Sequence, residues 1–264
     1  MNRPLVSVVT PSLNQAAFVE RTLESVLSQE GDFDLEYIVV DGGSGDGTLG
    51  VLERYRDRVR LVVEPDRGQA DAVNKGLRLA RGSLLGWVNS DDLLRPGAVA
   101  RAVAAFEAHP DALWLHGRCD IVDGEDRPIR RWVAAYKDWR SRHFSRRSLL
   151  VENYVSQMTV FWRRELQEKV GLLDDSLRYT FDYDLWLRFS REGAPLYLGE
   201  ALAAFRWHPS SKSGSAFERQ FEEDFQVFLR HAPGDPWLRL RKRLRTAEIL
   251  AAYRALRLLR GDAS

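Results

Sequence analysis

The chain has 264 residues, a length that suits one large domain or two closely joined lobes. Hydrophobic residues make up 44% of it and charged residues 29%, which provides enough apolar mass for a core. The formal net charge is +1, from 39 basic and 38 acidic residues, so nothing in the charge balance indicates a nucleic-acid partner.

Cysteine content and hydropathy indicate the compartment. Cys119 is the one cysteine, so an internal disulfide and a cysteine zinc site are both excluded, and we interpret it as a small half-buried residue. The apolar segment at residues 4–9 is too short for a signal peptide, and no apolar run approaches the ~20 residues of a membrane span. We therefore expect a cytoplasmic protein, soluble or peripheral on the inner face of the membrane.

The first part of the chain alternates between strand and helix patterns. Short apolar segments predict strands at residues 5–10, 37–40, 61–63 and 84–88. Apolar residues at helical spacing predict helices at residues 18–27, 48–55 and 70–80, and a further helix that begins at Pro96. This alternation predicts an α/β fold with a mainly parallel central sheet and helices on both faces.

After about residue 112 the pattern changes. The turn Asp123-Gly124, between apolar residues 113–122 and 128–133, predicts a hairpin. A basic stretch at 139–150 is helical or irregular. Further strands are predicted at 155–162, 195–198 and 201–207, and further helices at 163–170, 183–191, 217–229 and, beyond a linker at 233–236, at 237–259. The boundaries divide the chain into residues 1–112, 113–232 and a basic tail, 233–264.

Each of the first strands is followed by polar or glycine-containing residues. These are Pro11-Ser12, Asp41-Gly42, Asp66-Arg67 and Asp91-Asp92. Ligands of parallel sheets bind outside the carboxyl ends of the strands. Four separate segments therefore deliver carboxylates and flexible backbone to one edge of the sheet, and this convergence predicts a ligand site there.

Asp91 and Asp92 are the strongest metal-site candidates. Adjacent carboxylates raise each other's pKa unless a cation lies near them. Mg²⁺ or Mn²⁺ takes oxygen ligands and shares them with phosphate. The alternative is a turn in which one aspartate caps the next helix. The pair alone does not distinguish a metal site from a capping turn, but together with the other strand ends it favours a metal site.

Two further loops carry candidate nucleotide contacts. Asp41 begins a glycine-rich segment that is neither a dinucleotide fingerprint nor a P-loop, and it suits a nucleobase or ribose. The alternative there is a tight turn in which Asp46 or Thr48 caps the next helix. Asp66 suits a base or ribose and Arg67 or Lys75 a phosphate, with a solvated surface pair as the alternative for Arg67.

The second half contributes isolated candidates. Asp182 and Asp184 form a second acidic cluster, in which Asp182 suits a general base; for Asp184 we favour a helix cap. His208 follows a predicted strand, and a lone histidine there is either structural or a third metal ligand.

Five motifs resemble those of the family 2 glycosyltransferases, which have the GT-A fold. They agree in order and spacing over roughly residues 4–210: Pro11-Ser12-Leu13-Asn14-Gln15, Asp41-Gly42-Gly43-Ser44, Glu64-Pro65-Asp66-Arg67-Gly68, Asn74-Lys75-Gly76 and Asn89-Ser90-Asp91-Asp92. The resemblance implies inverting transfer of a sugar from a nucleotide-diphosphate sugar to an acceptor hydroxyl, in the assembly of cell-surface polysaccharide or glycolipid. It makes residues 1–112 the donor-binding half and 113–232 the acceptor-binding half.

The resemblance also implies roles for single residues. The implied nucleotide-sugar contacts are Pro11, Asn14, Asp41, Asp66, Arg67, Lys75, Asp91 and Arg206. The implied ligands of Mn²⁺ or Mg²⁺ are Asp91 and Asp92, completed by His208, with Asn89 where the family usually has the first acid of its Asp-x-Asp motif. Asp182 matches the catalytic base, although Phe181 replaces the usual glutamate before it. Gln157 and Trp186 match acceptor-side positions.

The tail is basic and amphipathic. Its basic residues are Arg239, Arg241, Lys242, Arg243, Arg245, Arg254, Arg257 and Arg260. Its apolar side comprises Leu240, Leu244, Ala247, Ala251 and Leu258. Such a helix lies on an anionic membrane close to a lipid-linked acceptor, or it packs on the body with a solvated basic face.

Two other functions remain as alternatives. A sugar-nucleotide pyrophosphorylase is disfavoured because no glycine-rich, arginine-containing segment follows the first strand. A non-catalytic nucleotide-sugar-binding protein is disfavoured because Asp91, Asp92 and Asp182 are all present.

Overall fold

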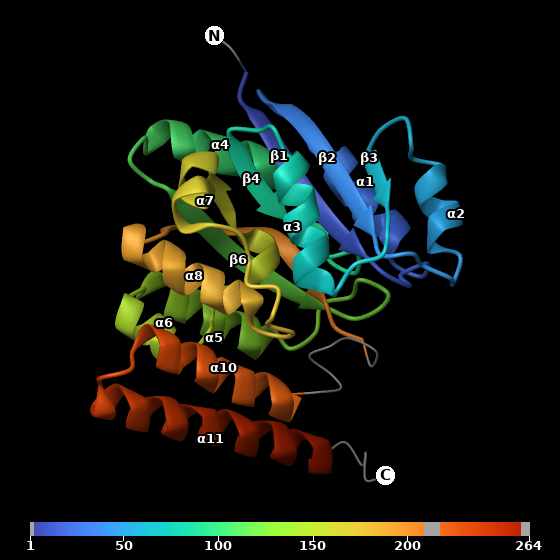
Figure 1. Cartoon of the computed structure of the whole chain (residues 1–264). Helices are drawn as coiled ribbons and strands as arrows, with labels where there is room; N and C mark the ends of the chain where they lie inside the picture. The colour runs from blue at the N-terminus through green and yellow to red at the C-terminus, as the bar shows by residue number, and fades with distance from the viewer. Residues whose placement is uncertain (1–2, 209–216, 260–264) are drawn as a thin grey trace.

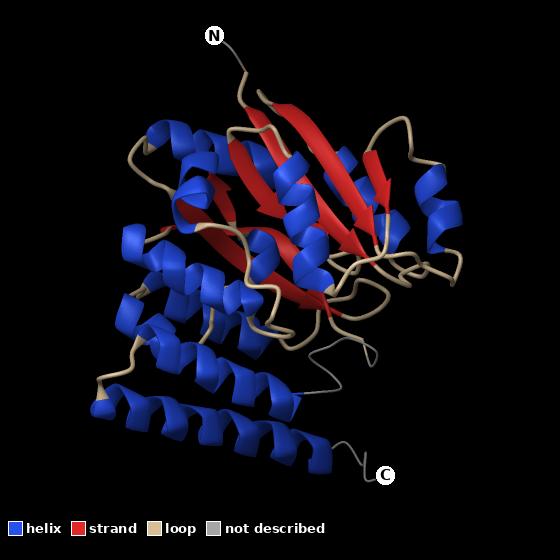
Figure 2. Cartoon of the chain, in the orientation of Figure 1, coloured by secondary structure: helices blue, strands red, loops and turns tan. Residues whose placement is uncertain are grey.

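The structure, a computed structural model, describes residues 3–208 and 217–259. Eight strands form one sheet in the order β3-β2-β1-β4-β7-β6-β8-β5 (Figure 2). The strands are β1 (Leu5–Ser12), β2 (Asp34–Asp41), β3 (Arg60–Val63), β4 (Leu84–Trp87), β5 (Leu93–Leu94), β6 (Trp114–Val122), β7 (Phe161–Arg163) and β8 (Leu196–Arg206). The strands β1 to β4 pair in parallel, as do β6 and β8, whereas β7 and β5 are antiparallel to their neighbours.

Helices cover both faces of this mostly parallel sheet (Figure 1). They are α1 (Val19–Leu27), α2 (Thr48–Glu53), α3 (Gln69–Leu79), α4 (Ala98–Ala108), α5 (Arg131–Arg142), α6 (Arg146–Val151), α7 (Arg164–Val170), α8 (Phe181–Glu192), α10 (Phe217–His231) and α11 (Pro236–Leu259), with a 3₁₀ turn at Gln157–Thr159. Within the described residues, no helix has the length and apolar character needed to cross a membrane.

Alternate residues of the central strands point into two separate cores. Val8 packs with α1 and α4, whereas Val9 packs with α3 and α8, as the two-residue period of a strand requires. Gly76 lets α3 approach the sheet closely, because a Cβ atom there would lie 2.3 Å from Cγ1 of Val9. The observed strands and helices of the first half therefore confirm the predicted α/β fold.

One boundary in the first half differs from its prediction. We expected β1 to end at Thr10, but the strand continues through Pro11, which pairs with Val40 of β2. On the other side β4 pairs with β1 only as far as Val9. Beyond Val9 the β1 strand is therefore open on that side, where a residue without an N–H group is tolerated.

Three predictions for the second half were wrong in detail. The predicted hairpin is reduced to a single bridge between Val122 and Pro128, and residues 131–133 begin α5. The predicted strand at 155–162 is interrupted by the 3₁₀ turn at Gln157–Thr159, and strand pairing begins only with β7 at Phe161. The two strands expected at 195–198 and 201–207 are one strand, β8, whose pairing with β6 shifts register at Gly117/Arg118.

The tail forms the predicted helix and packs on the body. In Figure 1, α8, α10 and α11 lie in successive layers below the sheet, and α11 also contacts α6. Its packed side carries Leu238 and Lys242, which are 4% and 1% exposed. Arg260 lies outside the described residues, as do the side chains of Arg254, Arg257 and Leu258.

Candidate active site

The carboxyl ends of the first three strands meet in register. Ser12 pairs with Asp41, and Asp41 pairs with Val63, so the loops that follow β1, β2 and β3 leave the sheet side by side. The loops are in close contact, since a Cβ atom on Gly42 would lie 2.3 Å from Oδ2 of Asp66. The structure thus brings together the strand ends that the sequence predicted to converge.

Asp41 organises the glycine-rich loop that follows it. Its Oδ1 accepts hydrogen bonds from the backbone N–H groups of Gly43 (3.0 Å) and Ser44 (2.7 Å), and its Oδ2 accepts one from the Ser44 hydroxyl (2.7 Å). Asn14 joins the loop after β1 to this loop, because its Oδ1 accepts from the Gly45 N–H at 2.9 Å. The expected turn is present too, with Asp46 accepting from the Thr48 N–H at 3.0 Å.

The basic residues near Asp66 are engaged by other groups of the protein. The Arg67 guanidinium lies 2.5 Å from Asp175 and 3.3 Å from Asp71, and its side chain is 75% exposed. The Lys75 ammonium donates to the carbonyl of Pro65 at 2.7 Å. These contacts correspond to the surface pair that we considered for Arg67, and contact with phosphate remains a prediction for both residues.

Asp92 is a buried structural carboxylate. Its Oδ1 accepts from the backbone N–H of Arg206 (3.0 Å) and its Oδ2 from the amide of Asn89 (3.1 Å), and the residue has no exposure. Burial raises the pKa of Asp92 well above its ordinary value, and the neighbouring charge of Asp91 raises it further. This corrects the expectation that Asp92 is a metal ligand, because both of its oxygens are occupied inside the protein.

Asp91 is the carboxylate that faces outward. Its side chain is 20% exposed, and its Oδ2 lies 3.2 Å from Nε2 of His208, a ring that packs on Phe18 at a centroid distance of 4.5 Å. Asn89, at the usual first acid position, instead accepts from Gln69 at 2.7 Å. Asp91 and His208 form a two-residue donor set, and the described residues contain no group of three or more His, Cys, Asp or Glu suited to a metal.

Arg206 supports this pair from inside the protein. It is fully buried, and its guanidinium donates to Oδ1 of Asp126 at 2.8 Å and to the carbonyl of Asp91 at 2.6 Å. Arg21 of α1 contacts the other oxygen of Asp126 at 2.7 Å. We expected Arg206 to contact the nucleotide sugar, but its burial and its protein partners give it a positioning role. Sequence analysis missed Asp126, which lies in a turn without any recognised motif.

Asp182 lies in the first turn of α8, near the carboxyl end of β4. The ring of the preceding residue, Phe181, lies 6.2 Å from that of Trp87, the last residue of β4. Asp182 accepts hydrogen bonds from the Tyr183 N–H (2.7 Å) and from the amide of Asn153 (3.4 Å). Burial raises the pKa of Asp182 to about 6, although these hydrogen bonds oppose the shift. Sequence analysis gave no signal for Asn153.

The two predicted acceptor residues differ in their surroundings. The Gln157 amide donates to the carbonyl of Trp87 at 2.7 Å, and its Oε1 has no hydrogen-bond partner among the described residues. Trp186 has no exposure and stacks on Trp87 and Trp114 at 5.7 and 6.1 Å. The expectation that Trp186 contacts the acceptor was therefore wrong, because its ring belongs to the aromatic core. Asp184 holds Arg188 and His231 instead of capping its helix.

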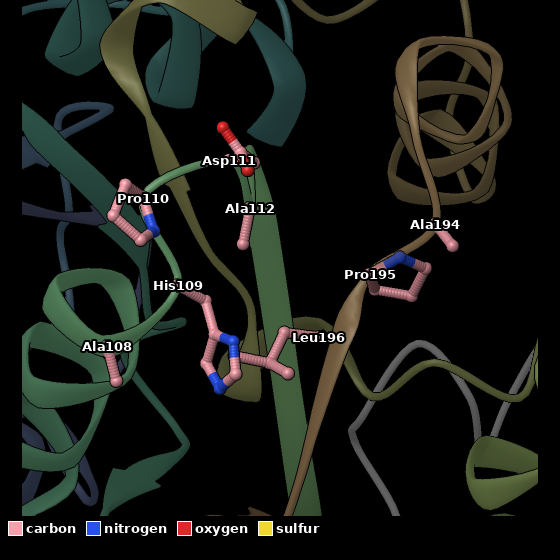
Figure 3. A pocket seen from close by; sticks show the side chains of 8 residues that line it. All are labelled: Ala108, His109, Pro110, Asp111, Ala112, Ala194, Pro195 and Leu196. Atoms are coloured by element: carbon pink, nitrogen blue, oxygen red, sulfur yellow. The ribbon is translucent and has the colours of Figure 1, made fainter.

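Two hollows lie on the surface. One of about 640 Å³ borders His208 and is also lined by Phe18, Arg21 and Trp207. The other, of about 410 Å³, lies between residues 108–112 and 194–196, where β6 and β8 begin (Figure 3). That end of the sheet is opposite the carboxyl edge of β6 and β8, so the second hollow is not part of the site.

Comparison with known proteins agrees with this arrangement. Residues 7–168 match the model of a family described as glycosyl transferase family 2. The chain belongs to glycosyl transferase family 2. The match removes support for the pyrophosphorylase alternative, and it confirms the resemblance drawn from the five motifs.

Relatives span most of the chain. An uncharacterized glycosyltransferase of Rickettsia prowazekii is 26% identical over 237 residues, which cover 86% of this chain and 72% of the relative. A PGL/p-HBAD biosynthesis glycosyltransferase of Mycobacterium tuberculosis is 32% identical over 71% of this chain and 70% of the relative. A chondroitin synthase of Escherichia coli is 28% identical over 85% of this chain but only 32% of its own length.

A solved structure has the same GT-A type of fold. It is the mannosyltransferase PcManGT from Pyrobaculum calidifontis in complex with GDP-Man and Mn²⁺, with a TM-score of 0.64 and 20% sequence identity. The similarity covers 98% of this chain and 81% of that one.

Proposed function

We propose that this glycosyltransferase moves a sugar from a nucleotide-diphosphate sugar to an acceptor hydroxyl, with inversion and with a divalent cation, Mn²⁺ or Mg²⁺. The observation that carries the proposal is Asp182, a carboxylate with a pKa of about 6 beside the strand edge that holds the family's motifs. A general base works best when its pKa lies near the working pH.

The donor set of Asp91 and His208 fits such a cation. A carboxylate oxygen is a ligand that Mg²⁺ and Mn²⁺ prefer, and an imidazole nitrogen is a common metal ligand. Because the described residues supply these two side chains and no third His, Cys, Asp or Glu beside them, oxygens of the diphosphate would fill remaining positions. When bound, the cation offsets the negative charge that develops on the departing diphosphate. The mannosyltransferase PcManGT, which has a similar fold and was solved in complex with GDP-Man and Mn²⁺, supports this proposal.

The chain's own residues bind the donor and move the proton. The loops after β1, β2 and β3 hold the nucleoside, through Pro11, Asn14 and Asp66, while the buried Asp41 shapes the loop that receives it. Arg67 and Lys75 turn toward the diphosphate when it arrives. Ionised Asp182 takes the proton from the attacking hydroxyl, a contribution of about 10²–10⁴-fold. A single displacement inverts the anomeric carbon, so no enzyme nucleophile is needed. Gln157 is held beside the end of β4 by its hydrogen bond to Trp87, and its Oε1, which is buried and has no partner among the described residues, would bind an acceptor hydroxyl only once the site opens to admit the acceptor.

The reaction can be tested with a panel of nucleotide sugars, by measuring release of the nucleoside diphosphate with Mn²⁺ and with a chelator. We expect metal-dependent turnover that is lost in Asp91→Asn. The matched control is Asp111→Asn, an exposed aspartate at the opposite end of the sheet. Turnover that is indifferent to the chelator and survives Asp91→Asn would contradict the metal site.

We also propose that α11 holds the enzyme on the inner face of an anionic membrane, close to a lipid-linked acceptor of polysaccharide or glycolipid assembly. The described part of its apolar side points outward: Trp237, Leu240 and Leu244 are 75%, 48% and 56% exposed. The packed side instead buries Lys242. Exposed tryptophan and leucine flanked by arginine is the composition of an interfacial helix.

Vesicle sedimentation tests this membrane contact. We expect the protein to bind phosphatidylglycerol vesicles more strongly than phosphatidylcholine vesicles, and the triple variant Trp237→Ala, Leu240→Ala, Leu244→Ala to lose most of that binding. The charge control replaces Arg58 and Arg78, two exposed arginines of the donor half, with glutamine. Equal binding by the triple variant and the wild type would show that α11 only packs on the body.

A further inference from the structure

Helix α10 carries a glutamate whose hydrogen bonds all go to the segment before α8. Oε1 of Glu223 accepts from the backbone N–H groups of Tyr179 and Thr180, both at 2.7 Å, and from the Thr180 hydroxyl at 2.8 Å. Its Oε2 accepts from the backbone N–H of Arg178 at 2.9 Å. One carboxylate therefore binds three consecutive backbone groups and a hydroxyl that lie more than 40 residues away in sequence.

These contacts hold the segment that leads into α8, because the bonded N–H groups belong to residues 178–180 and not to the first turn of the helix. Thr180 is the N-cap residue of α8, and its side chain makes no capping bond to its own helix. Backbone N–H groups need an acceptor when they leave water, and an ionised acceptor forms the stronger bonds. Burial opposes ionisation of Glu223, but the hydrogen bonds outweigh burial and hold its pKa below the ordinary value. Glu223 therefore ionises at a lower pH than Asp182, whose pKa is raised.

Helix α10 is itself fixed on both of its neighbours. Asp224, the next residue, forms a buried ion pair with Lys242 of α11, and the Lys242 ammonium lies 3.4 Å from the hydroxyl of Tyr183 in α8. Farther along α10, His231 lies 2.8 Å from Asp184 of α8. Residues 178–180, before Asp182, and Tyr183 and Asp184, after it, are thus held from α10 and α11, which ties the first turn of α8 to α10.

We propose that Glu223 is a positioning residue for the transfer reaction. By holding residues 178–180, it keeps the first turn of α8 in place, and with it the half-buried position and raised pKa of Asp182. This inference rests on the assignment of Asp182 as the base. A residue that only stabilised the fold would not affect the pH dependence of catalysis, whereas Glu223 should affect it through Asp182.

The variant Glu223→Gln tests the proposal, since it keeps the size of the side chain but replaces one acceptor oxygen with an NH₂ group that faces an N–H donor. We expect kcat to fall by about 10–100-fold, the range in which a displacement of 1 Å acts. The KM for the nucleotide sugar should stay unchanged, because the donor loops lie on other elements. As water reaches Asp182, the acid limb of the pH–rate profile should move from about 6 toward the ordinary aspartate value.

Glu222→Gln is the matched control. Glu222 is the exposed neighbour on the same helix, and its substitution changes the charge by the same amount. Thr180→Val, which removes one of the four hydrogen bonds, serves if Glu223→Gln does not fold, and should move the same limb in the same direction by a smaller amount. A normal kcat and an unmoved acid limb in the folded variant would overturn the proposal. An acid limb that persists in Asp182→Asn would instead overturn the assignment of the base, whatever Glu223 does.

Discussion

The edge formed by β1–β4 and the α8–α11 region hold their functional residues by different means. On the sheet edge, strand register sets Ser12, Asp41 and Val63 side by side, and hydrogen bonds between neighbouring loops fix the loops that follow them. In the α8–α11 region, Asp182 depends on side chains from distant segments, among them Asn153 and Glu223. Donor binding therefore rests on the backbone of one sheet, whereas proton transfer rests on the packing of several helices.

This difference makes chemistry and binding separable by mutation. Changes in the α8–α11 region should lower the rate of transfer without altering donor affinity. Changes at the strand ends should alter donor and metal affinity first.

The largest expected effect is that of Asp182→Asn. The amide cannot accept the hydroxyl proton, so kcat should fall by about 10²–10⁴-fold while the KM for the donor changes little. Steady-state kinetics with a saturating acceptor would measure both. A variant with full activity would remove Asp182 as the base and with it the contrast between the two regions.

Lys242→Met should destabilise the protein by about 3–5 kcal/mol, because it leaves Asp224 buried without its partner. Urea unfolding would measure the loss. The double variant Lys242→Met, Asp224→Leu should recover most of it, and Lys169→Met, at an exposed ion pair, should cost less than about 1 kcal/mol. An equal loss of unfolding free energy in Lys242→Met and Lys169→Met would show that the ion pair between α10 and α11 contributes no more than an exposed ion pair.

The pH–rate profile should show an acid limb with its midpoint at about 6. Asp182 must be ionised to act, and burial raises its pKa, so turnover should rise with pH through this range. Below the midpoint it should fall by about tenfold per pH unit. A midpoint near 4 in the wild type would indicate that Asp182 is open to water.

Arg67→Gln should have the smallest effect. Its guanidinium is exposed and contacts Asp71 and Asp175, so unfolding free energy should change by less than about 1 kcal/mol. The KM for the donor is the sharper measurement for this variant. We expect this KM to rise by about tenfold, because Arg67 exchanges these carboxylates for the diphosphate. An unchanged KM would show that Arg67 stays with Asp71 and Asp175.

The sheet edge was predictable because strand periodicity and turn residues are local signals. Continuous apolar segments placed β1 to β4, and parallel order alone brought Asp41, Asp66 and Asp91 to one edge. The burial of Asp92 was not predictable, since it depends on β8 pairing with β5 and thereby placing the Arg206 N–H beside it.

The directions in which side chains face in the α8–α11 region could not be predicted, for a related reason. Helical spacing shows that a side is apolar but not which way that side faces. Trp186 therefore turned inward, while Leu240 and Leu244 turned outward. The buried Lys242 runs against the usual exposure of lysine, and only the position of Asp224 on another helix accounts for it.

The most direct test of the separation between the two regions is calorimetric titration of UDP and GDP in the presence of Mn²⁺, with Asp91→Asn and Asp182→Asn measured side by side. We predict that Asp182→Asn binds whichever nucleotide the wild type binds with unchanged affinity, and that Asp91→Asn loses the part of the affinity that depends on Mn²⁺. Loss of Mn²⁺-dependent binding in Asp182→Asn, with normal binding in Asp91→Asn, would contradict the account.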